Sequence, residues 1–284
     1  MIGIIPYYPP PIFHIFDVPL DSWSLLVSLG FIIGVEFARA RAKQLGIAVK
    51  DVVDGALFIV GMGFVVGHFV HVGVYNPHLI DEHGWIIMLQ IWAGFSSNGG
   101  FVGAIFGTMI WFMVIRKRAP FWKYADTMAY SLPFGWFFGR LGCFSAHDHI
   151  GARTDFFLAV DFPEVWYDGP RHDLGLYEAI WVLLLAVIHF SLRKKKLPHS
   201  SFAMLFCFLY APARFGLDFL RNTDLSNADV RLLGLTPAQY GSIVFFLCGL
   251  VLFSQRKKRG IYFEEKASTL SIEKEMEEST NHNL

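Results

Sequence analysis

The stretch Phe134-Gly-Trp-Phe-Phe-Gly-Arg-Leu-Gly-Cys-Phe-Ser-Ala-His-Asp-His-Ile-Gly151 begins as an apolar helix and ends in a polar cluster. Arg140 lies in its apolar part, between Gly139 and Gly142. An arginine inside a hydrophobic span costs about 2.5 kcal/mol or more on insertion scales, so its presence indicates a function. The flanking glycines allow another backbone or a ligand to approach it closely. The rest of the chain is best understood as the scaffold around this arginine.

The composition is that of a polytopic membrane protein. Of the 284 residues, 54% are hydrophobic, including 29 Phe and 8 Trp, and the net charge is zero. Soluble domains of this length rarely have so many large apolar side chains. The balanced charge argues against a nucleic-acid partner, because no basic surplus is available to neutralise phosphates. Cys143, Cys207 and Cys248 lie singly in apolar stretches without metal-ligand spacing, so we expect no metal site and no cofactor.

Seven segments are long and apolar enough to cross about 30 Å of hydrocarbon as helices. They are 22–38, 56–75, 99–115, 128–146, 176–192, 202–220 and 238–255. We therefore expect an all-α polytopic membrane domain with seven transmembrane helices over residues 1–260. The charged, acidic segment 261–284 reads as a solvated or disordered tail. No long internal repeat is evident, which disfavours a transporter built from two matching halves.

The basic residues indicate how the helices are oriented. Sixteen of the 24 Lys and Arg residues follow odd-numbered segments, at 39–50, 116–123, 193–196 and 256–259. Basic residues concentrate on the cytoplasmic side of membrane proteins. This pattern predicts an N-terminus outside the cell and a cytoplasmic C-terminus.

With this orientation, the polar residues of the membrane segments gather in the outer half of the bilayer. Arg140 and Arg214 each lie about 12 residues, or roughly 18 Å, along an outward-running helix, and His68 lies at a similar depth. Two arginines at one depth repel each other unless an anion lies between them. Asp218, one helical turn after Arg214, can neutralise one of them. A lipid phosphate is the natural remaining partner, because the guanidinium fork matches phosphate oxygens.

Further candidates for substrate binding lie at the same face: Asn98, Gly99, Gly100, Tyr177, Glu178 and Gln239, beside Asp218 and His68. Gly99 and Gly100 either present free helix N–H groups to an anion or allow close helix packing. Tyr177, Glu178 and Gln239 either orient the site or cap helices. His68 either forms a hydrogen bond in the bundle, touches lipid headgroups, or acts as a base.

Five motifs, in order along the chain, resemble those of the prolipoprotein diacylglyceryl transferase family. Residues 139–148, followed by Gly151, resemble the family signature Gly-Arg-x-Gly-Asn-Phe-x-Asn-x-Glu. Residues 95–103 resemble the family motif His-Gly-Gly-x-x-Gly, and residues 170–178 resemble Arg-His-Pro-Ser-Gln-Leu-Tyr-Glu. Residues 214–221 resemble Arg-Phe-x-x-Glu-Phe-x-Arg, and residues 234–239 resemble Gly-x-Ser-x-Gly-Gln. Residues 19–25 also look like the outer N-terminal segment of that family.

The resemblance implies a multi-pass enzyme of the bacterial cytoplasmic membrane, active in its outer leaflet. Such an enzyme moves diacylglycerol from phosphatidylglycerol onto the lipobox cysteine thiol of a preprolipoprotein, forming a thioether and releasing glycerol phosphate. The motif arginines are retained as Arg140 and Arg214, and the motif glutamates are Asp148 and Asp218. The motif histidine is Asn98. Trp23, Cys143 and Ala146 stand where the family has Tyr, Asn and Asn.

Alkylation of a thiol needs a thiolate and a stabilised phosphate leaving group. Arg140 and Arg214 suit the second task, although pairing with Asp148 and Asp218 would also explain them. For removal of the thiol proton an amide such as Asn98 is useless.

His147 and His149 lie at the outer end of the fourth segment, and an imidazole can accept a proton near neutral pH. They are equally well explained as ordinary interfacial loop histidines. Cys143 could be a reactive nucleophile, but a helix-buried thiol is commonly a small packing residue.

Two other functions stay open. The chain could be a divergent homologue that uses another acceptor, or a phospholipid- or lipoprotein-binding membrane protein without catalysis. A channel or transporter is disfavoured, because the polar residues stop in the outer half of the bilayer. A histidine pointing into the space between Arg140 and Arg214 would favour catalysis, whereas solvent-facing His147 and His149 would favour binding.

Overall fold

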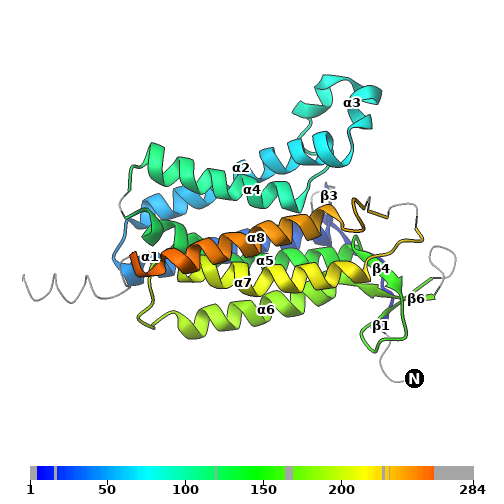
Figure 1. Ribbon diagram of the computed structural model, residues 1–284. Helices are drawn as coiled ribbons and strands as arrows, with labels where there is room; N and C mark the ends of the chain where they lie inside the picture. The colour runs from blue at the N-terminus through cyan, green and yellow to red at the C-terminus, as the bar shows by residue number, and fades with distance from the viewer. Residues whose placement is uncertain are drawn as a thin grey trace, which may run out of the picture.

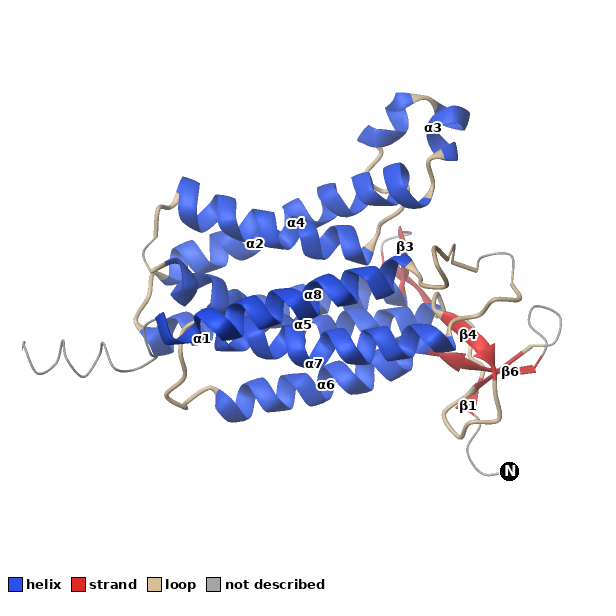
Figure 2. Cartoon of the chain, in the orientation of Figure 1, coloured by secondary structure: helices blue, strands red, loops and turns tan. Residues whose placement is uncertain are grey.

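The computed structural model describes residues 5–15, 18–118, 120–163, 169–225, 228–229 and 231–258. Long helices lie side by side in one bundle, with a small sheet at one end (Figures 1 and 2). The long helices are α1 (Ser22–Leu45), α2 (Val49–Val70), α4 (Ser97–Met109), α5 (Phe121–Ala146), α6 (Leu174–Leu192), α7 (Ser201–Leu217) and α8 (Pro237–Gln255). Both α2 and α4 continue as π-helical turns, at His71–Tyr75 and Ile110–Ile115. The short α3 (His78–His83) and a 3-10 turn at Trp85–Leu89 connect them.

Each predicted segment falls on one of the long helices, and the chain is a mostly helical, multi-pass membrane protein. Within the described residues, six helices are long and apolar enough to cross a membrane: α1, α2, α4, α6, α7 and α8. The helix outside this set, α5, is 26 residues long but contains Lys123, Asp126 and Arg140. A seventh crossing and the orientation of the termini therefore remain predictions. The predicted tail, 261–284, lies outside the described residues.

Glycines bring the helices of the bundle into close contact in pairs. A Cβ at Gly30 of α1 would lie 2.6 Å from the carbonyl oxygen of Gly135 on α5, and a Cβ at Gly135 would lie 2.6 Å from that of Gly30. On α4, a Cβ at Gly103 would lie 2.4 Å from the Met62 carbonyl oxygen of α2. Small residues are the usual means of helix packing in membranes, where lipid supplies no hydrophobic force between helices.

The expectation of an all-α chain is wrong at one end of the bundle. Strands β1 (Ile5–Pro6), β5 (Val160–Phe162), β6 (Gly169–Asp173) and β4 (Ile150–Arg153) form a sheet in that order, in which β1 and β5 are parallel and the other pairs antiparallel. Strands β2 (Ile12–Ile15) and β3 (Val18–Asp21) form a separate hairpin. These strands are two to five residues long, too short for a periodic pattern to indicate them, and β1 pairs with β5 about 155 residues away.

The sheet fixes the chain that leaves the end of α5. Its apolar face, Ile150, Val160 and Phe162, packs on Phe144 of that helix. At Gly151 a Cβ would lie 2.5 Å from the carbonyl oxygen of Leu220, which explains why the signature ends in glycine. The α5 end is thereby held against the segment that follows α7, and this contact positions the site.

Candidate functional site

The centre of the site is a buried carboxylate between two buried arginines. Nε of Arg140, on α5, lies 2.9 Å from Oε2 of Glu178, on α6, and Nε of Arg214, on α7, lies 3.2 Å from Oε1. The three side chains are 3%, 2% and 10% exposed. The sequence predicted that an anion must separate the arginines and assigned this role to lipid phosphate. The structure shows that the carboxylate of Glu178 occupies the position; the sequence named Glu178 as a substrate-binding residue but did not indicate that it pairs with the arginines.

These ion pairs leave hydrogen-bonding capacity unused. Nε of Arg140 and Oε1 of Glu178 are buried but neither forms a hydrogen bond of acceptable geometry. The guanidinium of Arg140 also lies over the Trp136 ring, 4.7 Å from its centroid. Tyr210 donates a hydrogen bond of 3.1 Å to Oε2 of Glu178 and so orients the shared carboxylate.

The expected pairing of Arg214 with Asp218 is present, with Nη1 2.5 Å from Oδ1. The Thr236 hydroxyl donates to the other carboxylate oxygen of Asp218. Thr236 and Gln239 form the capping box that begins α8, and the Gln239 amide donates to the Phe215 carbonyl oxygen of α7 at 3.2 Å. Asp218 and Gln239 thus hold α7 and α8 together beneath the site.

A cavity of about 170 Å³ opens above the arginines, between the ends of α4, α7 and α8. About 10–15 Å³ of such space holds one water molecule, so the cavity can take a phosphate ester with its glycerol. Its polar lining residues are His71, Tyr75, Ser96, Ser97, Asn98, Arg140, His149, Tyr210, Arg214, Arg221, Asp229 and Ser242. Four of the predicted site residues therefore share this cavity: Asn98, Arg140, His149 and Arg214.

Tyr75 and Tyr210 were missed by the sequence reasoning. The Asn98 amide donates a hydrogen bond of 2.7 Å to the Tyr75 hydroxyl oxygen. Tyr75 ends the predicted second segment, and Tyr210 precedes Arg214 by one helical turn, so depth and helical spacing could have identified both.

His147 and His149 have different environments. His147 ends α5 in a left-handed conformation, with φ of 50°. Its Nδ1 lies 2.8 Å from Oδ2 of Asp173, and its ring packs against Tyr7, Phe144 and Phe162. His149 instead lines the cavity, with Nε2 3.4 Å from Nη1 of Arg140. Of the two, His149 is the histidine that lies beside Arg140 and shares the cavity with Arg214.

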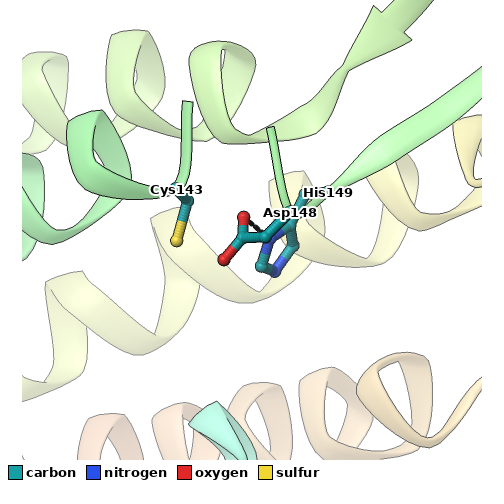
Figure 3. Close-up of side chains that lie close together, drawn as sticks. All are labelled: Cys143, Asp148 and His149. Atoms are coloured by element: carbon teal, nitrogen blue, oxygen red, sulfur yellow. Dashed lines mark hydrogen bonds and ion pairs between the residues drawn. The ribbon is translucent and has the colours of Figure 1, made fainter. Parts of the chain in front are cut away.

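Asp148 and His149 fold back onto the last turn of α5, where they meet Cys143 (Figure 3). The left-handed residue His147 reverses the chain, and the Asp148 backbone N–H bonds to the Cys143 carbonyl oxygen. Asp148 accepts a hydrogen bond from Nδ1 of His149. One potential ligand atom from each of Cys143, Asp148 and His149 lies within 4.8 Å of the other two, so these residues could hold a metal ion. Sequence spacing alone did not indicate such a cluster.

The protonation of this pair follows from its contacts. Burial by itself would lower the pKa of His149, but the contacts with the Asp148 carboxylate and Cys143 more than offset this and raise the pKa to about 9. Burial would raise the pKa of Asp148, and the His149 hydrogen bond outweighs it, so the net shift is downward. Asp148 is therefore a carboxylate at neutral pH.

The other predicted residues lie away from the cavity and have structural contacts. Both ring nitrogens of His68 face backbone carbonyls, those of Gly94 and Ile87, at 3.0 and 2.9 Å. Gly99 packs against α2, where a Cβ would lie 2.7 Å from Val70 Cβ, and Gly100 lies under the Phe95 ring. The Tyr177 hydroxyl pairs with Nδ1 of His172 at 2.9 Å, beside the sheet.

Comparison with known proteins places these motifs in one family. Residues 10–255 match the model of the family described as prolipoprotein diacylglyceryl transferase. The chain belongs to the prolipoprotein diacylglyceryl transferase family. The members of this family are transferases, so the protein is an enzyme of a family that acts in lipoprotein biogenesis.

Several similar proteins carry the name phosphatidylglycerol–prolipoprotein diacylglyceryl transferase. One from Haemophilus influenzae (strain PittEE) is 34% identical over 232 residues, which are 79% of this chain and 85% of that protein. One from Actinobacillus pleuropneumoniae serotype 3 is 32% identical over 253 residues, 87% of this chain and 93% of that protein. One from Bacillus licheniformis is 27% identical over 265 residues, 88% and 93% of the two chains. The similarity thus extends over nearly the whole bundle of this prolipoprotein diacylglyceryl transferase homologue.

Proposed function

We propose that the protein transfers diacylglycerol from phosphatidylglycerol to the lipobox cysteine thiol of a preprolipoprotein. The observation that carries this proposal is the cavity whose wall contains Arg140, Arg214 and His149 together. The reaction would take place in the outer leaflet of the bacterial cytoplasmic membrane, with the sheet outside the cell. The names of the similar proteins supply both substrates.

Arg140 and Arg214 would hold the lipid phosphate. Glu178 is shared by the two arginines and Asp218 by Arg214 and Arg221, and the Nε–H of Arg140 has no well-aligned acceptor. As the bond between the glyceryl carbon and the phosphate oxygen breaks, the phosphate gains a negative charge. Two guanidinium groups in a site with little water stabilise this charge as it develops.

The thiol would enter from the side of His149. The nucleophile must be the thiolate, which displaces glycerol phosphate from the lipid and forms a thioether. We assign stabilisation of the thiolate to His149, whose raised pKa keeps it an imidazolium at neutral pH and which Asp148 holds in place. Asn98 donates to Tyr75, and an amide cannot accept the thiol proton. His147 would instead stabilise the turn that carries Asp148 and His149.

The replacement of the motif histidine by Asn98 is the one observation that favours a second function, lipid binding without transfer. Complementation of a strain depleted of its own prolipoprotein diacylglyceryl transferase separates the two. We expect the wild-type chain to rescue growth and Arg140→Ala to abolish rescue. Failure of well-expressed, membrane-inserted wild-type protein to rescue growth, together with failure to label a lipobox peptide in vitro, would refute transfer and leave lipid binding.

A further inference from the structure

The residues that gather beside Arg140 have the composition of a transition-metal site. Cys143, Asp148 and His149 each offer one ligand atom, and the three atoms lie within 4.8 Å of one another. A thiolate, a carboxylate and an imidazole are the three ligand types that zinc accepts in proteins. Cys143 lies in the last turn of α5, and the other two residues lie in the segment that follows it (Figure 3). The left-handed residue His147 and the sheet fix the relative position of these two segments.

The distances require only small movements. Zinc bonds of about 2.0–2.3 Å put tetrahedral ligand atoms roughly 3.5 Å apart, so the widest spacing must close by about 1 Å. Asp148 is 41% exposed and so has room to rotate toward the other two ligands, whereas His149 is only 17% exposed. Nδ1 of His149 already faces the carboxylate, and the two atoms would separate to the spacing of tetrahedral ligands as the ion enters.

The nearby Arg140 does not exclude a cation. Its Nη1 lies 3.9 Å from Sγ of Cys143, and the charge of a lone ion would be repelled there. A zinc ion with one thiolate and one carboxylate is formally neutral, so the loaded site adds no net charge beside the arginine. With Nδ1 bound to the ion, Nε2 carries the ring hydrogen. Because Nη1 of Arg140 is 3.4 Å from that Nε2, one phosphate oxygen to the side of this pair can lie within hydrogen-bond distance of both nitrogens and accept from both.

Three protein ligands leave a fourth position, as in catalytic zinc sites. His149 lines the cavity, so the open position of the metal is accessible to a ligand that binds in the cavity. A thiol that coordinates zinc is deprotonated outright. Such a site would supply the thiolate in a chain whose motif histidine is Asn98.

We propose that Cys143, Asp148 and His149 bind a divalent transition metal, zinc in the first instance, whose open position receives the acceptor thiol. The role for the thiol rests on the proposed function, and it revises the expectation of no metal. On binding, the thiol releases its proton to water. The sulfur then forms a bond to the glyceryl carbon, the carbon–oxygen bond breaks, and its electron pair leaves on the phosphate held by Arg140 and Arg214. No oxidant or reductant is needed.

Metal binding can be tested without substrate. The full chain, purified in detergent with a tag that lacks histidine and stripped by a chelator, is titrated with Co²⁺. We expect one bound ion per chain and a near-ultraviolet sulfur-to-cobalt charge-transfer band, together with a higher unfolding temperature in Zn²⁺. Cys143→Ser should abolish the band, and Asp148→Asn should weaken binding by more than roughly tenfold, since even changes behind the ligands cost that much. Cys248→Ser, at an exposed thiol, is the matched control.

A second assay separates this inference from the proposed function. Chelated wild-type protein should lose diacylglyceryl transfer to a lipobox peptide and regain it with Zn²⁺ or Co²⁺. Full transfer after chelation, or no cobalt band in wild-type protein, overturns the metal site while the proposed function stands. A cobalt band that depends on Cys143, in a protein that never transfers, supports the metal site and refutes the proposed function.

Discussion

At the scale of single residues, Glu178 decides how two arginines coexist in an apolar bundle. It lies between Arg140 and Arg214, and the Tyr210 hydroxyl holds it there. Asp218 is a second carboxylate partner of Arg214. A phosphate that enters the cavity therefore meets arginines that are already fixed, so little side-chain freedom is lost when it binds.

Glu178→Gln should destabilise the protein by about 3–5 kcal/mol, the cost of removing one partner from a buried ion pair. Thermal unfolding in detergent measures this. Added phosphatidylglycerol should recover part of the loss, because its phosphate can take the place of the carboxylate. Glu36→Gln is the control: that glutamate is 52% exposed and pairs with Arg39 in solvent, so the change should leave the unfolding temperature nearly unchanged. Equal stability of the two variants would contradict the role given to Glu178.

Tyr75→Phe should raise the KM for the lipid about fivefold and leave kcat nearly unchanged. The Tyr75 oxygen accepts from Asn98, so its own hydrogen must point to another group, and the residue lines the cavity. Loss of one hydrogen bond costs about 1 kcal/mol. Tyr124→Phe, in the core at the opposite end of α5, serves as control. An unchanged KM in Tyr75→Phe would remove the hydroxyl from the binding site.

At the scale of elements, two devices position the site. The sheet and the left-handed turn at His147 bring 148 and 149 back over the end of α5. Glycines let α2 and α4 touch, and this pair carries Tyr75 and Asn98 to the cavity. Both devices act through backbone contact, which a single methyl group can disturb.

Gly103→Ala should lower the unfolding temperature, since its Cβ would lie 2.4 Å from the Met62 carbonyl oxygen and α2 must move. Gly61→Ala, on the same helix pair, meets nothing within 4 Å. Both substitutions gain up to about 1 kcal/mol in helix propensity, so their difference isolates the contact. Thermal unfolding in detergent that gives the same shift for both would show that the helices do not depend on this contact.

At the scale of the whole molecule, the Lys- and Arg-rich loops lie at one end of the bundle and the cavity lies near the other. The C-terminal ends of α1, α4, α6 and α8, where the basic residues gather, point away from the sheet (Figure 1). The cavity lies near the other end, beside the ends of α5 and α7. A bundle with basic loops at one end and the proposed phosphate site near the other is consistent with chemistry on the outer side of the membrane.

Cysteine labelling tests this orientation. In intact cells, a membrane-impermeant maleimide should label Asp155→Cys, in the exposed loop beside the sheet, but label Lys196→Cys only after the membrane is permeabilised. Wild-type protein, with its three native cysteines, gives the background. Labelling of Lys196→Cys in intact cells would reverse the predicted topology.

The sequence by itself determined the helical class, the position of each long helix, the family and the presence of two arginines within the helices. Hydropathy, and the free-energy cost of burying a charge in the membrane, are properties of individual residues, so both can be evaluated from the sequence alone. Only the tertiary structure decided that Glu178 separates the arginines, that His149 faces the cavity while His147 does not, that a sheet covers one end, and that Cys143 meets Asp148 and His149. These depend on contacts between distant segments and on the reversal of the chain at one residue, neither of which leaves a periodic signal.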